Sequence, residues 1–108
     1  MDIDAYAQWV DTRRLKPTVA KVDAEVFITL AGMIGELGEV AEHLKKRIRD
    51  GKEISEEAVT KEMGDVLFYW CRMCNHLKVS PEAIIRANIR KLTGRIERGT
   101  ERGSGDDR

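Results

Sequence analysis

A regular recurrence of apolar residues between Asp23 and Arg49 constrains the fold of this chain more than any other feature. Apolar side chains return every three or four positions, which is the period of one face of an α-helix. They are Phe27, Leu30, Ile34, Leu37, Ala41, Leu44 and Ile48. Asp23 is a suitable N-cap, and Gly51 is a suitable stop. The pattern predicts one long amphipathic helix over residues 23–49.

A second stretch, from Ser55 to Leu77, predicts another long helix. Ser55 is a suitable N-cap, and apolar residues again recur at helical spacing. They are Val59, Met63, Val66, Trp70, Met73 and Leu77, and the surface is widened by Leu67, Phe68 and Cys74. A short break at Asp50-Gly51-Lys52 separates the two stretches, so the two helices can fold back antiparallel.

Two shorter helices are expected near the ends of the chain. Residues 4–15 have a looser apolar spacing that stops before Pro17. Ser80-Pro81 is a helix start, because proline fits the first helical position, and this helix is expected to run to Arg98. We therefore predict an all-α fold, an antiparallel helical bundle of about four helices.

The length of the chain indicates how this bundle is completed. With 108 residues it is near the lower size at which one chain buries a core comfortably, and 35% of the residues are charged. We expect oligomerisation to complete the bundle. Residues 1–98 form the expected domain, and residues 99–108 form a glycine-rich, polar tail that composition predicts to be flexible.

The charge balance limits the classes of partner. The 19 basic and 19 acidic side chains cancel, so no net field attracts nucleic acid or an anionic membrane. No apolar run approaches the roughly 20 residues of a membrane span, and no signal peptide is recognisable. Cys71 and Cys74 lie on an apolar stretch and are interpreted as reduced core thiols. We expect a cytoplasmic protein without nucleic-acid or membrane partners.

Two acidic pairs carry the chemistry of the chain. Glu36 and Glu39, like Glu62 and Asp65, are three positions apart, so each pair lies on one face of its helix. If the helices are antiparallel, four carboxylates come together and repel one another unless a cation lies among them. Hard oxygen ligands suit Mg²⁺, with Mn²⁺ as a substitute, and such ions complete their shell with substrate phosphates. The pairs predict a metal–phosphate site.

Two other interpretations of the acidic residues were weighed. A non-catalytic helical interaction module could use them as a solvated face that binds a basic partner. That interpretation does not account for the glycines beside both pairs, each of which costs a helix about 0.5–1 kcal/mol. A di-iron bundle requires Glu-x-x-His pairs, but His43 lies four residues after Glu39 and His76 lies far from Asp65.

Further residues are candidates for contact with a substrate. Asn88, Lys91 and Arg95 share one helical face and would present an amide and two cations to phosphate groups. Tyr69 lies one turn beyond Asp65, where it could touch a sugar or base or simply pack in the core. Trp9 could stack on a base or pack against the protein.

Four segments resemble one known family. The segments starting at Gly35 and Lys61, Gly-Glu-Leu-Gly-Glu-Val-Ala-Glu and Lys-Glu-Met-Gly-Asp-Val-Leu-Phe-Tyr, resemble the two helical motifs of the MazG-like all-α nucleoside triphosphate pyrophosphohydrolases. Asn88-x-x-Lys91-x-x-x-Arg95 resembles the family's phosphate-side segment, and Gly103-Ser104-Gly105-Asp106-Asp107-Arg108 resembles the tail of small, often phage-type members. The resemblance covers residues 25–108, and the N-terminal part matches poorly.

The resemblance implies a function and roles for residues. Members assemble at least as homodimers and cleave nucleoside triphosphates between the α and β phosphates, with Mg²⁺, to a monophosphate and pyrophosphate, which controls or sanitises nucleotide pools. By this likeness Glu36, Glu39, Glu62 and Asp65 would hold the metal, and Lys91 and Arg95 would face phosphates. Glu39 and Glu62 are the candidate catalytic carboxylates, with Glu39 preferred as general base. If the tail is an active-site lid, Asp106 and Arg108 are its expected contacts.

Overall fold

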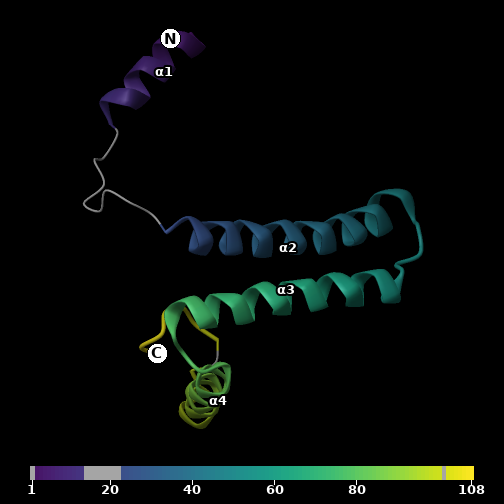
Figure 1. Cartoon of the computed structure of the whole chain (residues 1–108), viewed down its shortest axis with the longest axis vertical. Coiled ribbons are helices and arrows are strands. Elements are labelled where there is room, and N and C mark those ends of the chain that lie inside the picture. The colour runs from purple at the N-terminus through teal and green to yellow at the C-terminus, as the bar shows by residue number, and fades with distance from the viewer. Residues whose placement is uncertain (1, 14–22, 101) are drawn as a thin grey trace.

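The structure is a computed structural model that describes residues 2–13, 23–100 and 102–108. In these residues all regular secondary structure is α-helical (Figure 1). The helices are α1 (Ile3–Thr12), α2 (Ala24–Asp50), α3 (Glu56–Leu77) and α4 (Pro81–Arg98). The all-α prediction is confirmed. The first helix is shorter than predicted, because α1 ends at Thr12, and residues 14 and 15 lie outside the described ranges.

The helix boundaries follow from local chemistry. The side chain of Asp23 accepts hydrogen bonds from the amides of Glu25 and Val26, and each predicted serine cap accepts one from the residue three positions on. These bonds satisfy amides that would have no partner within the helix. Gly51 and Gly99 end their helices with φ angles of 67° and 69°, the left-handed conformation that glycine adopts without strain.

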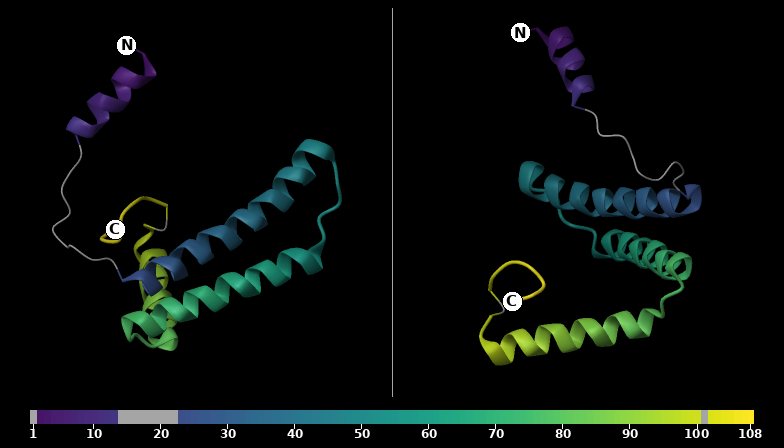
Figure 2. Two further views of the ribbon diagram at one scale, coloured as in Figure 1. Left: turned by 45° about the horizontal axis from the view of Figure 1, so that its top comes forward. Right: turned by 90° about the vertical axis from the view of Figure 1, so that its left-hand side faces the viewer.

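Helices α2 and α3 form an antiparallel pair (Figures 1 and 2). Three contacts hold the pair in register. Thr29 Oγ1 lies 3.1 Å from His76 Nε2 at one end, the ring of Tyr69 covers Gly32, and His43 Nε2 lies 3.2 Å from Glu62 Oε1 toward the loop. Residue numbers therefore rise along α2 as they fall along α3, as the break at residues 50–52 predicted.

The face that α2 turns to α3 is not its apolar stripe. The partly or fully buried positions of α2 fall on a line between that stripe and the polar face: Val26, Thr29, Gly32, Met33, Glu36, Val40 and His43. In contrast, Ile34 is 61% exposed and Ile48 86%. Cys74 is the one buried apolar side chain among the described residues. A single pair of helices is too thin to cover both faces, so the stripe remains available to another partner.

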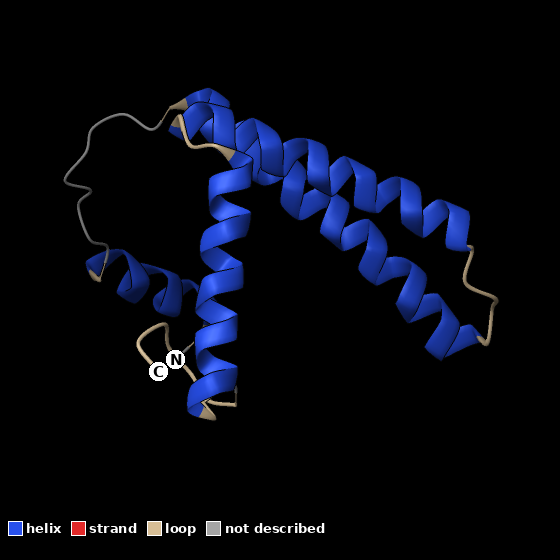
Figure 3. Ribbon diagram, turned by 90° about the horizontal axis from the view of Figure 1, so that it is seen from below, coloured by secondary structure: helices blue, strands red, loops and turns tan. Residues whose placement is uncertain are grey.

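Helix α4 leaves the end of α3 and runs away from the α2–α3 pair (Figure 3). A four-helix bundle within one chain is therefore not formed by the described residues, and completion by oligomerisation stays a prediction. The tail turns back onto α4: Arg98 Nη2 donates to the backbone oxygen of Arg108, and Arg108 Nε donates to that of Thr100, both at 2.9 Å. Gly105 and Asp106 also accept hydrogen bonds from α4, and the flexibility of the tail stays a prediction.

Two smaller expectations concern the thiols and the membrane. Cys71 and Cys74 are both free, and Cys74 is buried, as predicted. None of the helices in the described part of the chain has the length and apolarity needed to cross a bilayer.

Candidate active site

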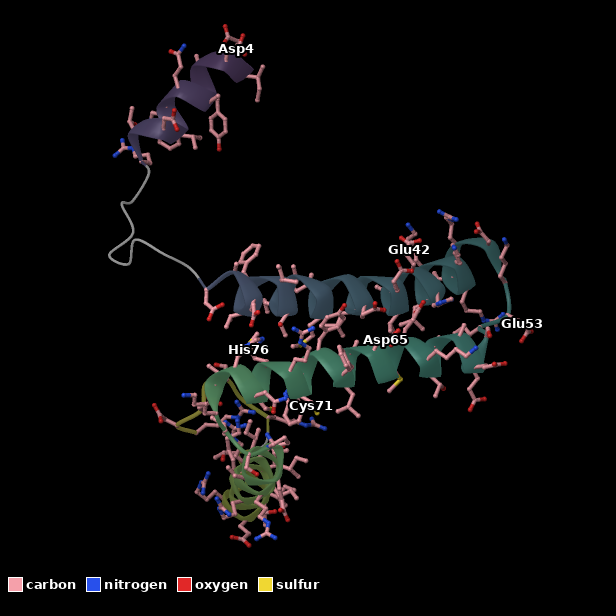
Figure 4. The ribbon with its side chains drawn as sticks, viewed as in Figure 1. Asp4, Glu42, Glu53, Asp65, Cys71 and His76 are labelled. Atoms are coloured by element: carbon pink, nitrogen blue, oxygen red, sulfur yellow. The ribbon has the colours of Figure 1, made fainter. Side chains whose placement is uncertain are left out.

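The two predicted acidic pairs lie along the contact between α2 and α3. Glu36 and Glu62 are partly buried on the facing sides of the two helices, and Glu39 and Asp65 are exposed beside them. Figure 4 shows Asp65 on α3 at the edge that borders α2. Desolvation raises the pKa of Glu36, and the negative charges of Asp65, Glu39 and Glu62 raise it further. The four carboxylates are thus close enough for electrostatic interaction.

The four acids do not form a closed cage. Within the described residues, no group of three or more acidic, histidine or cysteine side chains is arranged to hold a metal ion. Like charges repel with nothing positive between them, so open carboxylates are the expected state of such a site without a cation.

His43 is a member of this site that sequence reasoning did not select. Its Nε2 lies 3.2 Å from Oε1 and 3.1 Å from Oε2 of Glu62. The hydrogen bond goes to Oε1, and the buried Oε2 makes no hydrogen bond of its own. A buried carboxylate oxygen without a donor is costly, and a cation would satisfy it. The donor set therefore fits a hard divalent ion. The signal in the sequence was the position of His43, one turn beyond Glu39.

Tyr69 lies one turn from the acids and packs against α2. A Cβ atom at Gly32 would lie 2.6 Å from Cε1 and Cζ of the tyrosine ring, so only glycine allows this approach. A Cβ atom at Gly35 or Gly38 would meet nothing within 4 Å. Tyr69 therefore covers Gly32, whereas the surface of α2 at Gly35 and Gly38, beside the acids, is uncovered.

The predicted cations lie together on α4. Lys91 Nζ lies 3.3 Å and Arg95 Nη2 3.2 Å from Oδ1 of Asp106 in the tail, and Arg95 also donates to the backbone oxygen of Gly105. The hydrogen bonds from Lys91 and Arg95 hold the pKa of Asp106 below its ordinary value. Arg95 is only 4% exposed. The tail carboxylate thus occupies the place where these two cations would meet an anion.

Residues 27–99 match the MazG nucleotide pyrophosphohydrolase domain. The chain belongs to this family. The matched span begins in α2 and ends at the cap of α4, so it contains both acidic pairs and the cations of α4. The resemblance predicted from the motifs is confirmed, and membership implies a nucleotide pyrophosphohydrolase.

A phage protein is similar to this MazG chain over its whole length. The Gene 37 protein of Mycobacterium phage L5 is 35% identical over 115 residues, which cover all of both chains. Its name states no activity. No solved structure matches the chain.

Three candidate residues lie outside the MazG match, namely Trp9, Asp106 and Arg108. Trp9 stacks on Tyr6 at 5.8 Å, and Arg13 lies over its ring, so its contacts in the structure are within its own segment. Arg108 donates to the backbone oxygen of Gly105 and so bends the tail around Asp106.

The remaining candidate, Asn88, lies within the MazG match on α4. With Ile84, Ala87 and Lys91 it lines an open hollow. An apolar surface beside an amide and a cation is suited to the ring of a ligand that also bears a negative charge. Figure 3 shows that α4 as a whole runs away from the α2–α3 pair of its own chain.

Proposed function

We propose that this MazG protein is a Mg²⁺-dependent nucleoside triphosphate pyrophosphohydrolase. It cleaves ribo- or deoxyribonucleoside triphosphates between the α and β phosphates, releases the monophosphate and pyrophosphate, and so controls or sanitises nucleotide pools in the cytoplasm. The observation that carries this proposal is the convergence of Glu36 and Glu39 of α2 with Glu62 and Asp65 of α3, close enough that the charges of the other three acids raise the pKa of Glu36.

The acidic residues would hold the ion. Glu36, Glu39, Glu62 and Asp65 offer only hard oxygen ligands, which favours Mg²⁺, with Mn²⁺ as a substitute. When bound, such an ion lowers the pKa of water and neutralises charge that develops on phosphate. Glu39 is exposed beside the pair and is our candidate for the general base that accepts the proton of the attacking water. Glu62 is the partly buried carboxylate that would fix the geometry.

The other side chains would hold the nucleotide. Lys91 and Arg95 would bind phosphate oxygens, because both already bind a carboxylate in the tail. Asn88 would contact the nucleoside from the adjoining hollow, and Tyr69 would contact it from the edge of the acidic site. Trp9, whose ring is 45% exposed, would stack on the base.

The tail would act as a lid. Asp106 occupies the phosphate position at Lys91 and Arg95 until phosphate oxygens replace its carboxylate, and Arg108 bends the tail into position. Because Asp106 is 83% exposed on its side chain, it can leave the two cations without crossing the protein interior.

A second copy of the chain would complete the site, as a homodimer or homotetramer. The apolar stripe of α2 is exposed along its length, and monomeric proteins rarely leave so long an apolar surface uncovered. Helix α4, which carries the cations, also runs away from the α2–α3 pair that carries the acids (Figure 3). Association through the stripe of α2 would bury it and would let one chain offer cations to another chain's acids.

The test is release of pyrophosphate from a panel of ribo- and deoxyribonucleoside triphosphates, with Mg²⁺ and with chelator. Wild type is compared with Glu62→Gln and with the control Glu53→Gln, which makes the same change in the exposed loop between α2 and α3. We expect metal-dependent release of pyrophosphate and the matching monophosphate, lost in Glu62→Gln alone. A folded protein that is inactive on the whole panel and does not bind Mg²⁺ or Mn²⁺ would favour the interaction module instead.

A further inference from the structure

His43 is the one partner that the structure provides for the acidic site. Within the described part of the chain it makes the only hydrogen bond or ion pair to any of Glu36, Glu39, Glu62 or Asp65. It lies on α2, one turn after Glu39 and two turns after Glu36, and it reaches across to α3. The contact lies between the two helices, and both side chains are largely buried there: 28% of His43 and 20% of Glu62 are exposed.

The chemistry of the contact fixes the direction of the hydrogen bond. An ionised carboxylate can only accept, so Nε2 of His43 must donate. The donated bond goes to Oε1 of Glu62 and leaves Oε2 buried without a bond. Oε1 therefore accepts the hydrogen bond, whereas Oε2 accepts none although it lies 3.1 Å from the same nitrogen. A carboxylate oriented in this way by one neighbour can bind a cation with its second oxygen.

A residue that orients Glu62 has a clear role in the acidic site. A glutamate side chain has three rotatable bonds, and Glu62 lies within electrostatic reach of Glu36, so an anchor is needed to keep it from turning toward solvent. We propose that His43 is the positioning residue of the acidic site, which donates from Nε2 to Oε1 of Glu62 and so keeps Oε2 available to the divalent ion. The inference rests on the proposed function, because it requires that the acids bind such an ion.

The alternative role of His43 is direct ligation of the ion through the same nitrogen. The two roles differ in what a glutamine at this position does. The side-chain amide of glutamine keeps an N–H donor for Glu62, but it does not replace imidazole as a nitrogen ligand. A glutamine variant therefore preserves positioning and loses ligation.

The experiment measures binding of Mn²⁺ alone, by the loss of the free-ion electron paramagnetic resonance signal, without nucleotide. The variants are His43→Ala, His43→Gln and the control His76→Ala, which removes the chain's other histidine from the same helix pair. We expect His43→Ala to weaken Mn²⁺ binding about 10- to 100-fold, the usual effect of losing such a partner. His43→Gln should bind within a few-fold of wild type, and His76→Ala should equal it.

Three outcomes would overturn the inference, and they differ in their consequence for the proposed function. Equal Mn²⁺ affinity in His43→Ala and wild type shows that Glu62 needs no anchor, and it leaves the proposed function intact. Loss of binding in His43→Gln as large as in His43→Ala makes His43 a ligand. Absence of Mn²⁺ binding in the folded wild type removes the metal from the proposed function as well. Circular dichroism establishes folding of each variant, and His43→Leu, which also lacks a donor, replaces His43→Ala if His43→Ala does not fold.

Discussion

The ring of Tyr69 lies against the backbone of α2 at Gly32, where a single added carbon would approach it to 2.6 Å. This contact joins the two helices one turn from Glu36 on one side and one turn from Asp65 on the other. The close approach of α2 and α3 at this point is therefore set by a residue without a side chain. The acids are positioned relative to each other partly by this glycine.

Replacing Gly32 with alanine should displace Tyr69 and destabilise the pair relative to a matched change at Gly35. Alanine gains about 0.5–1 kcal/mol of helix stability at either position. At Gly32 this gain is opposed by overpacking of about 1–3 kcal/mol. Urea unfolding should therefore rank Gly35→Ala above wild type and Gly32→Ala below Gly35→Ala. Equal stability of the two variants would show that the tyrosine ring moves aside freely.

Replacing Glu36 with glutamine should stabilise the metal-free protein. The pKa of Glu36 is raised in the folded state by desolvation and by three carboxylates, so folding disfavours its charged form. A carboxyl group with a raised pKa stabilises the fold as pH falls through that pKa, because the folded state then binds more protons than the unfolded state. The melting temperature of Glu36→Gln should exceed that of wild type most at about pH 7. The difference should shrink as the pH falls toward 4.5, the ordinary pKa of a glutamate.

The comparison for this measurement is Glu53→Gln, which removes an acid from the loop. Other acids have lowered pKa values, such as Asp50 beside Arg49, and they lose stabilisation as pH falls. They act equally in both variants, so the difference from wild type isolates Glu36. A Glu36→Gln variant no more stable than Glu53→Gln at neutral pH would contradict the electrostatic description of the site.

Local features of the fold could be predicted from the sequence, because their causes are local. Asp23, Ser55 and Ser80 cap helices through bonds to amides two or three residues away, and such bonds need no knowledge of the rest of the chain. The spacing within each acidic pair is likewise a property of one helix. The family motifs also predicted that the two acidic segments are followed along the chain by the segment that carries the cations.

The parts that could not be predicted depend on contacts between distant residues. An apolar stripe shows that a face will be covered, but not by what, and in this chain α3 covers the neighbouring line that contains Glu36 and His43. The bond from His43 to Glu62 depends on the register of α2 against α3, which no local signal specifies. The tail has the composition of a flexible end, and its position depends on Asp106 meeting Lys91 and Arg95.

A charge placed in the apolar stripe of α2 should dissociate the proposed oligomer. Ile34 lies in the stripe and is 61% exposed in the single chain, and Ile28 is similarly exposed but lies off the stripe. Burial of a glutamate at position 34 against another chain would be costly. Light scattering after gel filtration should give at least a dimer for wild type and Ile28→Glu and a monomer for Ile34→Glu. A monomeric wild type, or dissociation by both variants equally, would remove the stripe as the interface.

Removing the charge of Asp106 should increase affinity for pyrophosphate. The carboxylate of Asp106 competes with phosphate for Lys91 and Arg95, and ion pairs with so exposed a carboxylate contribute up to about 1 kcal/mol each. Asp106→Asn should therefore bind pyrophosphate roughly 2- to 10-fold more tightly by calorimetry. Asp107→Asn makes the same change one residue away, where the carboxylate makes no ion pair or hydrogen bond with the residues that the structure describes, and should bind as wild type does. Weaker binding in Asp106→Asn would instead mean that Asp106 holds the cations in the geometry that phosphate requires. Equal tightening in both variants would reduce the effect to net charge, and the tail would then not occupy the phosphate position.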